Sequence, residues 1–267
     1  MKIGILSDLY IDKLGLPPVP DVLPDVLVLA GNIGFGIKGI EWAVRTYDCP
    51  IIYVLGNYSY RGHDLDTFDA ELRSVAWGSN LHLLQNETLF VRGTRFIGST
   101  LWTDFALFGN EVIGMVHASE DCPDYRYIYR DHLGPITPGD TIALHRRAED
   151  YLWRTATDPY DDGHTVIITH HAPSLRSIPT GYRDDRIAAC FASKMDDLVI
   201  EADAMLWIHA GVYGPVDYML GNTRVVANPR GVWAGKEQLR EVGNFRADYA
   251  IELGKHRGDT PKRLVSR

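Results

Sequence analysis

The sequence predicts an α/β protein in which strands and helices form one sandwich. Short apolar runs that end in Gly, Asn, Asp or His recur along the chain, and stretches with apolar residues at helical spacing lie between them. The 267 residues suffice for a sizeable buried core. Because no internal repeat, low-complexity segment or linker interrupts the pattern, we expect a single domain over residues 1–254.

Five of the apolar runs are rich in β-branched or large apolar residues, which is typical of strands buried on both faces. They span 2–8, 25–32, 50–57, 165–171 and 204–211. Three further strand segments lie at 81–85, 88–100 and 216–229. The last two predict hairpins, with turns at Gly93-Thr94 and Gly221-Asn222.

Four segments predict helices, because their apolar residues return every three or four positions. They span 36–47, 64–77, 141–156 and 187–202. The stretch 103–140 is typical of a long loop region, and we expect either an active-site cap or an irregular surface excursion there. The basic tail 255–267 has little large apolar content, which predicts a frayed and flexible end.

Composition restricts the class of partner. The net charge of −8 argues against a nucleic-acid-binding surface. The three cysteines are widely spaced and odd in number, which indicates no disulfide framework and fits a reducing compartment. The apolar run at the N-terminus is too short for a signal peptide or a membrane span. We therefore expect a cytoplasmic protein without a membrane partner, and the sequence leaves its oligomeric state open.

Polar side chains follow each of the five buried strands. They are Asp8, Tyr10, Asn32, Asn57, Tyr58, His170, His171, His209 and Tyr213. One such residue would fit a helix cap or a hydrogen-bonded core histidine. Five strand ends in series indicate a functional site, because open α/β sheets place their sites at the carboxyl ends of strands.

The stretches SDLY, AGNIG, LGNYSY, THHAP and HAGVYG resemble the motif series of the calcineurin-like metallophosphoesterase family. The family pattern is D-x-H, G-D, G-N-H-[DE], H and G-H-x-H, each after a strand. The resemblance covers roughly residues 1–235 in order and spacing, and it implies a sandwich of two mixed β-sheets flanked by helices. Family enzymes hold two divalent metals (Mn, Fe or Zn) bridged by the G-D aspartate, which activate a water and bind phosphate oxygens.

The resemblance implies that three metal-ligand positions are retained. Asp8 stands at a ligand position of the first metal, and Asn57 at one of the second. His170 matches the second metal's histidine, although its neighbour His171 is an alternative for the same role.

The other positions of the motif series are replaced. Asn32 stands where the family has the bridging aspartate, and Tyr10 where the first metal has a histidine. Tyr58 replaces the histidine that assists the leaving group. Gly211 and Tyr213 replace the two histidines of the last motif, and His209 falls just before them.

These replacements predict that the bimetal site is dismantled and that no metal cofactor is held tightly. An amide oxygen is a poorer ligand for hard divalent cations than a carboxylate, and glycine supplies no side chain. The strands and glycines remain intact while the chemical side chains differ. This selectivity fits natural reuse of the scaffold as a pseudoenzyme, and it also fits an engineered inactivation or redesign.

The remaining side chains predict an aromatic pocket for a small molecule. Its walls would come from Tyr10, Tyr58 and Tyr213, with Tyr60 and Trp233 as further candidates. Polar contacts would come from Asp8, Asn32, Asn57, His170, His171 and His209. Alternatively, the tyrosines only fill the volume that the metals vacate.

Three functions follow from this interpretation. The first is a small-ligand binder or a metal-free catalyst, with Asp8 or His170 as the general base. The second is a weak phosphoesterase, acting on phosphomonoesters or phosphodiesters with one metal held by Asp8, Asn57 and His170. The third is a non-catalytic interaction protein in which the old site has no role.

Overall fold

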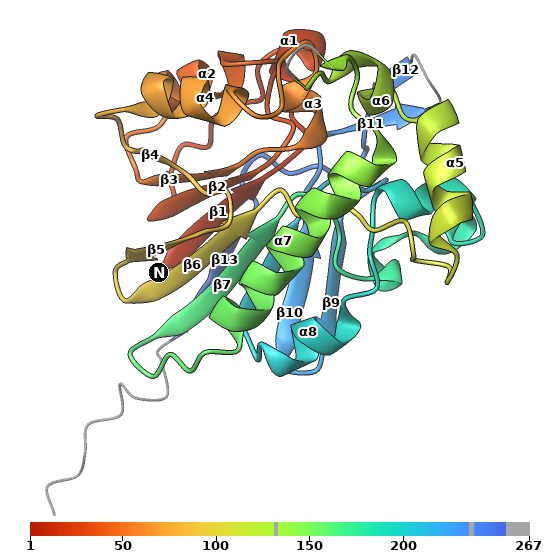
Figure 1. The fold of residues 1–267 in the computed structure, drawn as a ribbon. Coiled ribbons are helices and arrows are strands. Elements are labelled where there is room, and N and C mark those ends of the chain that lie inside the picture. The colour runs from red at the N-terminus through yellow and green to blue at the C-terminus, as the bar shows by residue number, and fades with distance from the viewer. Residues whose placement is uncertain (131–132, 235–237, 255–267) are drawn as a thin grey trace, which may run out of the picture.

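The computed structural model describes residues 1–130, 133–234 and 238–254, and the predicted flexible tail 255–267 lies outside them. Two large sheets form the centre (Figure 1). The first has the order β13-β1-β2-β3-β4 and consists of Ala250–Glu252, Lys2–Leu6, Val26–Ala30, Ile51–Val54 and Leu81–Leu83. The second has the order β5-β6-β7-β8-β10-β9 and consists of Glu87–Val91, Thr94–Ser99, His164–Thr169, Leu206–His209, Thr223–Ala227 and Val216–Leu220.

Both sheets are mixed. In the first, β1 to β4 run parallel and β13 pairs antiparallel with β1. In the second, β6, β7, β8 and β10 run parallel, while β5 and β9 are antiparallel edge strands. Both predicted hairpins, β5–β6 and β9–β10, are confirmed. The parallel strands of each sheet therefore end at a common edge, where loops can bring polar side chains together.

Three of the apolar clusters in the described residues form layers on and between the sheets. Between the sheets, residues such as Ile5 and Val28 of the first sheet pack with Val166 and Ile208 of the second. A second layer lies under α2 (Lys38–Thr46) and α4 (Phe68–Ala76), and a third under α7 (Pro138–Ala156) and α8 (Asp196–Glu201). Because each sheet has apolar neighbours on both faces, β2, β3 and β8 are buried along their whole length, as their sequences predict.

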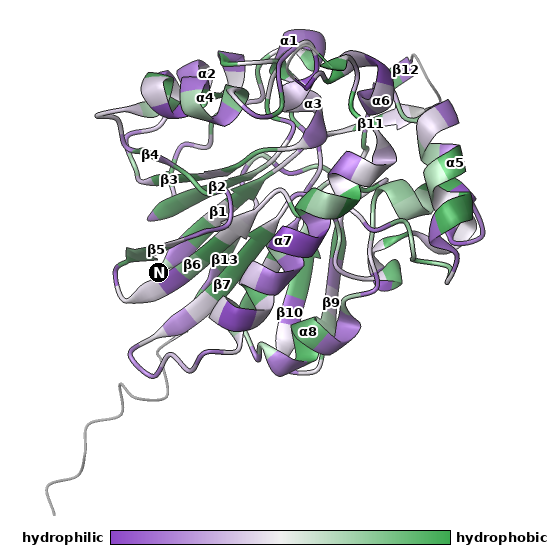
Figure 2. Ribbon diagram, viewed as in Figure 1, coloured by the Kyte–Doolittle hydropathy of each residue, from purple (hydrophilic) through white to green (hydrophobic). Residues whose placement is uncertain are grey.

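The helices cover the outer faces of the two sheets. Figure 1 shows α2 and α4 on the first sheet and α7 across the second. In Figure 2 these helices alternate between apolar and polar colours, whereas the inner strands are mostly apolar. This alternation agrees with the helical spacing from which the four helices were predicted. Three of them, α2, α4 and α7, are confirmed.

The helix predicted over 187–202 is wrong in its first half. That half forms the short 3₁₀ helix η4 (Arg186–Cys190), and α8 begins only at Asp196. Between them, Phe191 accepts a hydrogen bond from the Ala172 N–H, and Ser193 donates to the Ala172 carbonyl. The backbone at 191–193 thus pairs with the loop after β7. Those tertiary hydrogen bonds replace the intrahelical ones that a continuous helix would need.

Several short elements gather at the edge where the parallel strands end. They are α1 (Ile11–Leu14), α3 (Asn57–Tyr60), α5 (Glu111–Asp121), α6 (Asp124–Tyr127), η2 (Leu175–Ser177), η3 (Thr180–Tyr182) and the hairpin of β11 (Gly231–Ala234) and β12 (Gln238–Glu241). The long loop region expected at 103–140 thus contains two helices. Within the described part of the chain, no helix is both long and apolar enough to cross a lipid bilayer.

Candidate functional site

Three neighbouring strands deliver polar side chains to one point. Asp8 lies two residues beyond β1, Asn32 two beyond β2, and Asn57 three beyond β3. Because β1, β2 and β3 are parallel neighbours, these residues share one edge of the first sheet. Gly211, two residues beyond β8, approaches from the second sheet. The site therefore lies where the edges of the two sheets meet.

The backbone at these strand ends takes unusual conformations. Asp8, Tyr10 and Asn32 have φ values of +48°, +44° and +56°, in the left-handed region that Asp and Asn tolerate better than Tyr. Two glycines allow the loops to approach closely. A Cβ on Gly31 would lie 2.3 Å from His170 Nδ1, and one on Gly56 would lie 2.2 Å from Asn32 Oδ1. These left-handed conformations cost conformational energy, and they fix the positions of the side chains at the strand ends.

Asn32 is the centre of the polar cluster. Its Oδ1 accepts a hydrogen bond from the Tyr58 backbone N–H at 3.0 Å. Because a backbone N–H can only donate, this contact fixes which end of the amide faces the cluster. Nδ2 faces Asp8 Oδ1 and the Tyr10 hydroxyl at 3.0 Å each, and Asn57 Oδ1 at 3.2 Å. The amide therefore presents hydrogens, and not an oxygen, to its neighbours.

Asp8 is a carboxylate surrounded by donors. Its Oδ1 accepts from Asn32, with the Tyr10 hydroxyl at 3.5 Å, and its Oδ2 accepts from the Gly211 N–H at 3.0 Å. Only 1% of its surface is exposed. Burial raises the pKa of Asp8 to about 7, although these hydrogen bonds favour the charged form. Asp8 is thus poised to gain or lose a proton near neutral pH.

Asn57 connects the cluster to His170 and to α6. Its Nδ2 donates to Asp124 Oδ2 at 2.7 Å, so its Oδ1 is turned toward Asn32 and His170. His170 Nε2 lies 3.0 Å from that oxygen, and His170 Nδ1 lies 3.2 Å from the Ala30 carbonyl. Burial, with His171 adjacent, holds the pKa of His170 well below its usual range. The ring is therefore neutral at pH 7.

The other two predicted histidines turn away from the cluster. His171 Nδ1 lies 3.1 Å from the Thr100 carbonyl, and its ring stacks on Trp102. His209 Nε2 lies 2.8 Å from Ser177 Oγ, and its Nδ1 lies 3.1 Å from the Ala210 carbonyl. Burial lowers the pKa of each ring to about 4. His170, and not His171, is the histidine next to Asn57.

The predicted aromatic residues divide between a cavity and the core. Tyr10 and Trp233 line the cavity with Tyr213, whose ring stacks on Tyr182 at 4.2 Å between centroids. Tyr58 lies behind Tyr10, its ring edge-on at 5.0 Å, and its hydroxyl donates to Asp12 Oδ2 at 2.6 Å. Tyr60 is a core residue in the layer under α2 and α4, and its hydroxyl donates to Asp69. Neither Tyr58 nor Tyr60 is a cavity wall.

The cavity has a volume of about 460 Å³ and opens beside the cluster. Its floor includes Asp8, Asn32, Asn57 and Gly211. Residues 121–124, between α5 and α6, form one wall, and η4 with Phe191 contributes to another. None of His170, His171 and His209 is a lining residue. The cavity thus joins the cap-like region of 103–140 to the strand ends.

Arg61 and Asp124 are site residues that the sequence did not single out. Arg61 Nε lies 2.8 Å from Asp124 Oδ1, with both side chains largely buried. The guanidinium lies over the rings of Tyr58 and Trp233, at 5.4 and 5.9 Å from their centroids. The sequence contains only a weak indication of this pair. Arg61 directly follows the LGNYSY stretch, but Asp124 lies in a segment without a motif. The pair neutralises charge beside Asn57 and supports the cavity wall.

The polar cluster contains few side chains that can coordinate a metal ion. In the described ranges, no three His, Cys, Asp or Glu side chains are grouped so that they could hold a metal ion. Asn57 Oδ1 and His170 Nε2 lie next to each other, and Asp8 is the one carboxylate among the three retained ligand positions. The hydrogen-bond partners of Asp8 are N–H and O–H groups of Asn32, Gly211 and Tyr10.

Comparisons with known proteins give the fold. No family model matches the chain. It is 29% identical over 160 residues to "Uncharacterized protein L509" of Acanthamoeba polyphaga mimivirus, and this alignment covers 55% of each protein, about half the relative's length. The structure is similar to the crystal structure of phosphopantetheinyl hydrolase (PptH) from Mycobacterium tuberculosis, with a TM-score of 0.67, 15% identity, and coverage of 91% of this chain and 96% of that one. The fold is therefore a calcineurin-like metallophosphoesterase sandwich of two mixed sheets flanked by helices.

We predict that replacing the Asn32 amide by a carboxylate lowers the stability of the fold in a pH-dependent way. The variant Asn32→Asp would place a second carboxylate where Nδ2 now donates to Asp8 at 3.0 Å. Two buried carboxylates without a cation raise each other's pKa, so the folded pair binds protons more tightly than the unfolded chain. We expect a loss of about 1–3 kcal/mol at pH 7 in chelator. The loss shrinks toward pH 5, where one carboxyl of the pair takes up a proton.

Melting temperatures of the variant and the unaltered protein, compared at both pH values, measure this effect. The double variant Asp8→Asn/Asn32→Asp is the matched control, because it carries one carboxylate and should lack the additional pH-dependent loss. An unchanged or higher melting temperature for Asn32→Asp in chelator would show that the amide does not relieve a charge repulsion.

Proposed function

We propose that this chain is a metallophosphoesterase-fold protein without a bimetal centre, and that its cavity binds a small molecule. One observation carries the proposal: the buried carboxylate of Asp8 is held by N–H donors from Asn32 and Gly211, where a bimetal site would need ligands directed at a cation. The function is therefore binding in a metal-free site on a hydrolase fold.

The donor set does not fit two bridged divalent cations. Hard cations require oxygen or imidazole ligands, and the Asn32 Nδ2 group has no lone pair for a metal. Its amide cannot simply rotate, because the exchange would turn the NH₂ group toward the Tyr58 backbone N–H. Gly211 contributes only a backbone N–H, directed at Asp8. The retained acceptors Asp8, Asn57 and His170 are too few for two metals.

The cavity has the properties of a small-molecule site. Its volume of about 460 Å³ lies in the usual range for ligand pockets. Tyr10, Tyr213 and Trp233 supply aromatic walls, and Asn32 and Asn57 supply polar groups at the floor. Aromatic walls with a few convergent polar groups favour a ligand with an apolar or ring-shaped body and a polar end.

Acid–base chemistry at this site would depend on Asp8. Asp8 lines the cavity, and its pKa of about 7 is suited to a general base at neutral pH. His170, the other candidate base, lies behind Asn57 and does not line the cavity. The hydrolase activity named for the Mycobacterium tuberculosis protein is not carried over, because this chain lacks the ligand set that a bimetal hydrolase requires.

A ligand screen in chelator tests the binding function. We expect at least one compound from a millimolar panel of nucleotides, sugar phosphates, organic amines and aromatic acids to raise the melting temperature by a few degrees. The shift should disappear in Tyr213→Ala, which removes a cavity wall. It should persist in Tyr160→Ala, a half-buried tyrosine that is not part of the cavity lining. A panel without any shift, or a shift that Tyr213→Ala leaves intact, would contradict the binding function.

Restoring the family residues should restore metal binding. The fivefold variant Tyr10→His/Asn32→Asp/Tyr58→His/Gly211→His/Tyr213→His is expected to bind two divalent metals and hydrolyse an activated phosphodiester. Four of these positions already line one cavity, and Tyr58 packs against Tyr10. Gly211 has a φ of +63°, so a histidine there costs about 1–2 kcal/mol, which metal binding can offset. Metal content and hydrolysis are measured together.

The single variant Asn32→Asp is the control for the fivefold variant and should bind little metal, since ligands act as a set. If the fivefold variant folds but holds no metal, the assignment of these five positions is wrong.

A further inference from the structure

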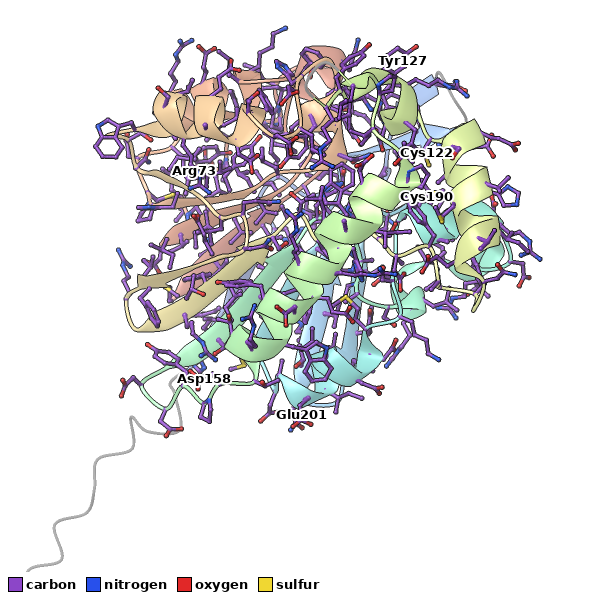
Figure 3. The ribbon with its side chains drawn as sticks, viewed as in Figure 1. Arg73, Cys122, Tyr127, Asp158, Cys190 and Glu201 are labelled. Carbon is purple, nitrogen blue, oxygen red and sulfur yellow. The ribbon has the colours of Figure 1, made fainter. Side chains whose placement is uncertain are left out.

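Cys122 and Cys190 form a pair of buried free thiols outside the polar cluster. Cys122 caps the C-terminus of α5, and Cys190 is the last residue of η4. Cys190 is the neighbour that acts most strongly on the Cys122 thiol. Figure 3 shows the two labelled side chains close together beside α5. Both thiols belong to one apolar cluster, which is the proximity that a disulfide requires.

Cys122 and Cys190 differ in their access to the cavity. Both belong to an apolar cluster with Phe105, Ala118 and Ile142. Cys122 also lines the cavity, whereas Cys190 is not a lining residue. A small reagent in the cavity can therefore reach Cys122, and Cys190 belongs to the same apolar cluster. The third cysteine, Cys49, is half-buried near the start of β3 and packs against a different core layer.

We propose that Cys122 and Cys190 are a covalent modification site, which a small-molecule disulfide converts into an intramolecular disulfide. The Cys122 thiolate attacks one sulfur of the reagent, breaks its S–S bond and releases one thiol, leaving a mixed disulfide on Cys122. The Cys190 thiolate then attacks Cys122 Sγ and expels the second thiol. Two protons from the cysteines pass to the two released thiols, so the pair loses two electrons and the reagent gains them.

The new bond would join two walls of the cavity. Residues 121–124 line it at the end of α5, and Asp185, Ile187 and Phe191 line it around η4. A disulfide between these segments fixes their separation and stabilises the fold, mainly by restricting the unfolded chain. The neighbouring Cys190 thiol, followed by burial, raises the pKa of Cys122 well above its usual range, so the reduced pair reacts slowly at neutral pH. This modification does not depend on whether the cavity binds a ligand.

Peptide mapping after oxidation tests the site. The full chain is incubated with oxidised glutathione, first in buffer at pH 8 and separately in urea, and free thiols are then blocked. Trypsin places the three cysteines on different peptides, 46–61, 96–126 and 187–194. We expect the folded protein to yield the link between 96–126 and 187–194 at least about tenfold over any link to 46–61. The unfolded chain should form links to 46–61 in comparable amounts, because the chain segments that separate neighbouring cysteines are nearly equal in length.

Two variants sharpen the result. Cys49→Ser should retain the link, and Cys190→Ala should convert it into a glutathione adduct on 96–126. The linked protein should melt about 5–10 °C above the reduced protein, and dithiothreitol should reverse the change. The proposal is overturned if the folded protein yields no link between 96–126 and 187–194, or if that link is no more abundant than in urea. Because the unaltered protein gives the main result, a variant that fails to fold does not affect the test.

Discussion

The hydrogen bond from Asn32 Nδ2 to Asp8 Oδ1, 3.0 Å long, is the contact on which the rest of the site depends. A carboxylate that is 99% buried requires either a cation or several donors to remain in the fold. Here the donors are the Asn32 amide and the Gly211 N–H. The compensation is incomplete, because burial still raises the pKa of Asp8 to about 7. The same amide also contacts Tyr10 and Asn57, so its orientation determines the whole cluster.

The fold makes this arrangement possible through its backbone. Parallel neighbours β1, β2 and β3 end at one edge, and the left-handed conformations at Asp8 and Asn32 turn both side chains toward each other. Gly31 and Gly56 leave room for His170 and for the Asn32 amide. These features determine where side chains point but not which chemistry they perform. A fold shared with a phosphopantetheinyl hydrolase therefore does not by itself assign a function to the polar cluster at these strand ends.

Much of the fold could be predicted from the sequence, and less of the site. Strands such as Val26–Ala30 and helices such as Phe68–Ala76 follow from apolar periodicity alone. The break in 187–202 could not, because it results from hydrogen bonds between residues 191–193 and Ala172, far away in the sequence. The strand-end pattern brought Asp8, Asn32 and Asn57 together, but it could not show that His171 and His209 turn to other partners. Arg61 and Asp124 were missed because an ion pair between distant segments leaves no local pattern.

The central claim is that donors around Asp8 take the place of metals, and metal content tests it most directly. The protein should be produced in medium supplemented with manganese, iron and zinc, purified without chelator, and analysed by elemental mass spectrometry against protein concentration. We predict well under one equivalent of transition metal per chain, because Asn32 and Gly211 direct N–H groups at the Asp8 carboxylate. Two tightly held metal ions per chain would contradict it and would indicate a bimetal hydrolase.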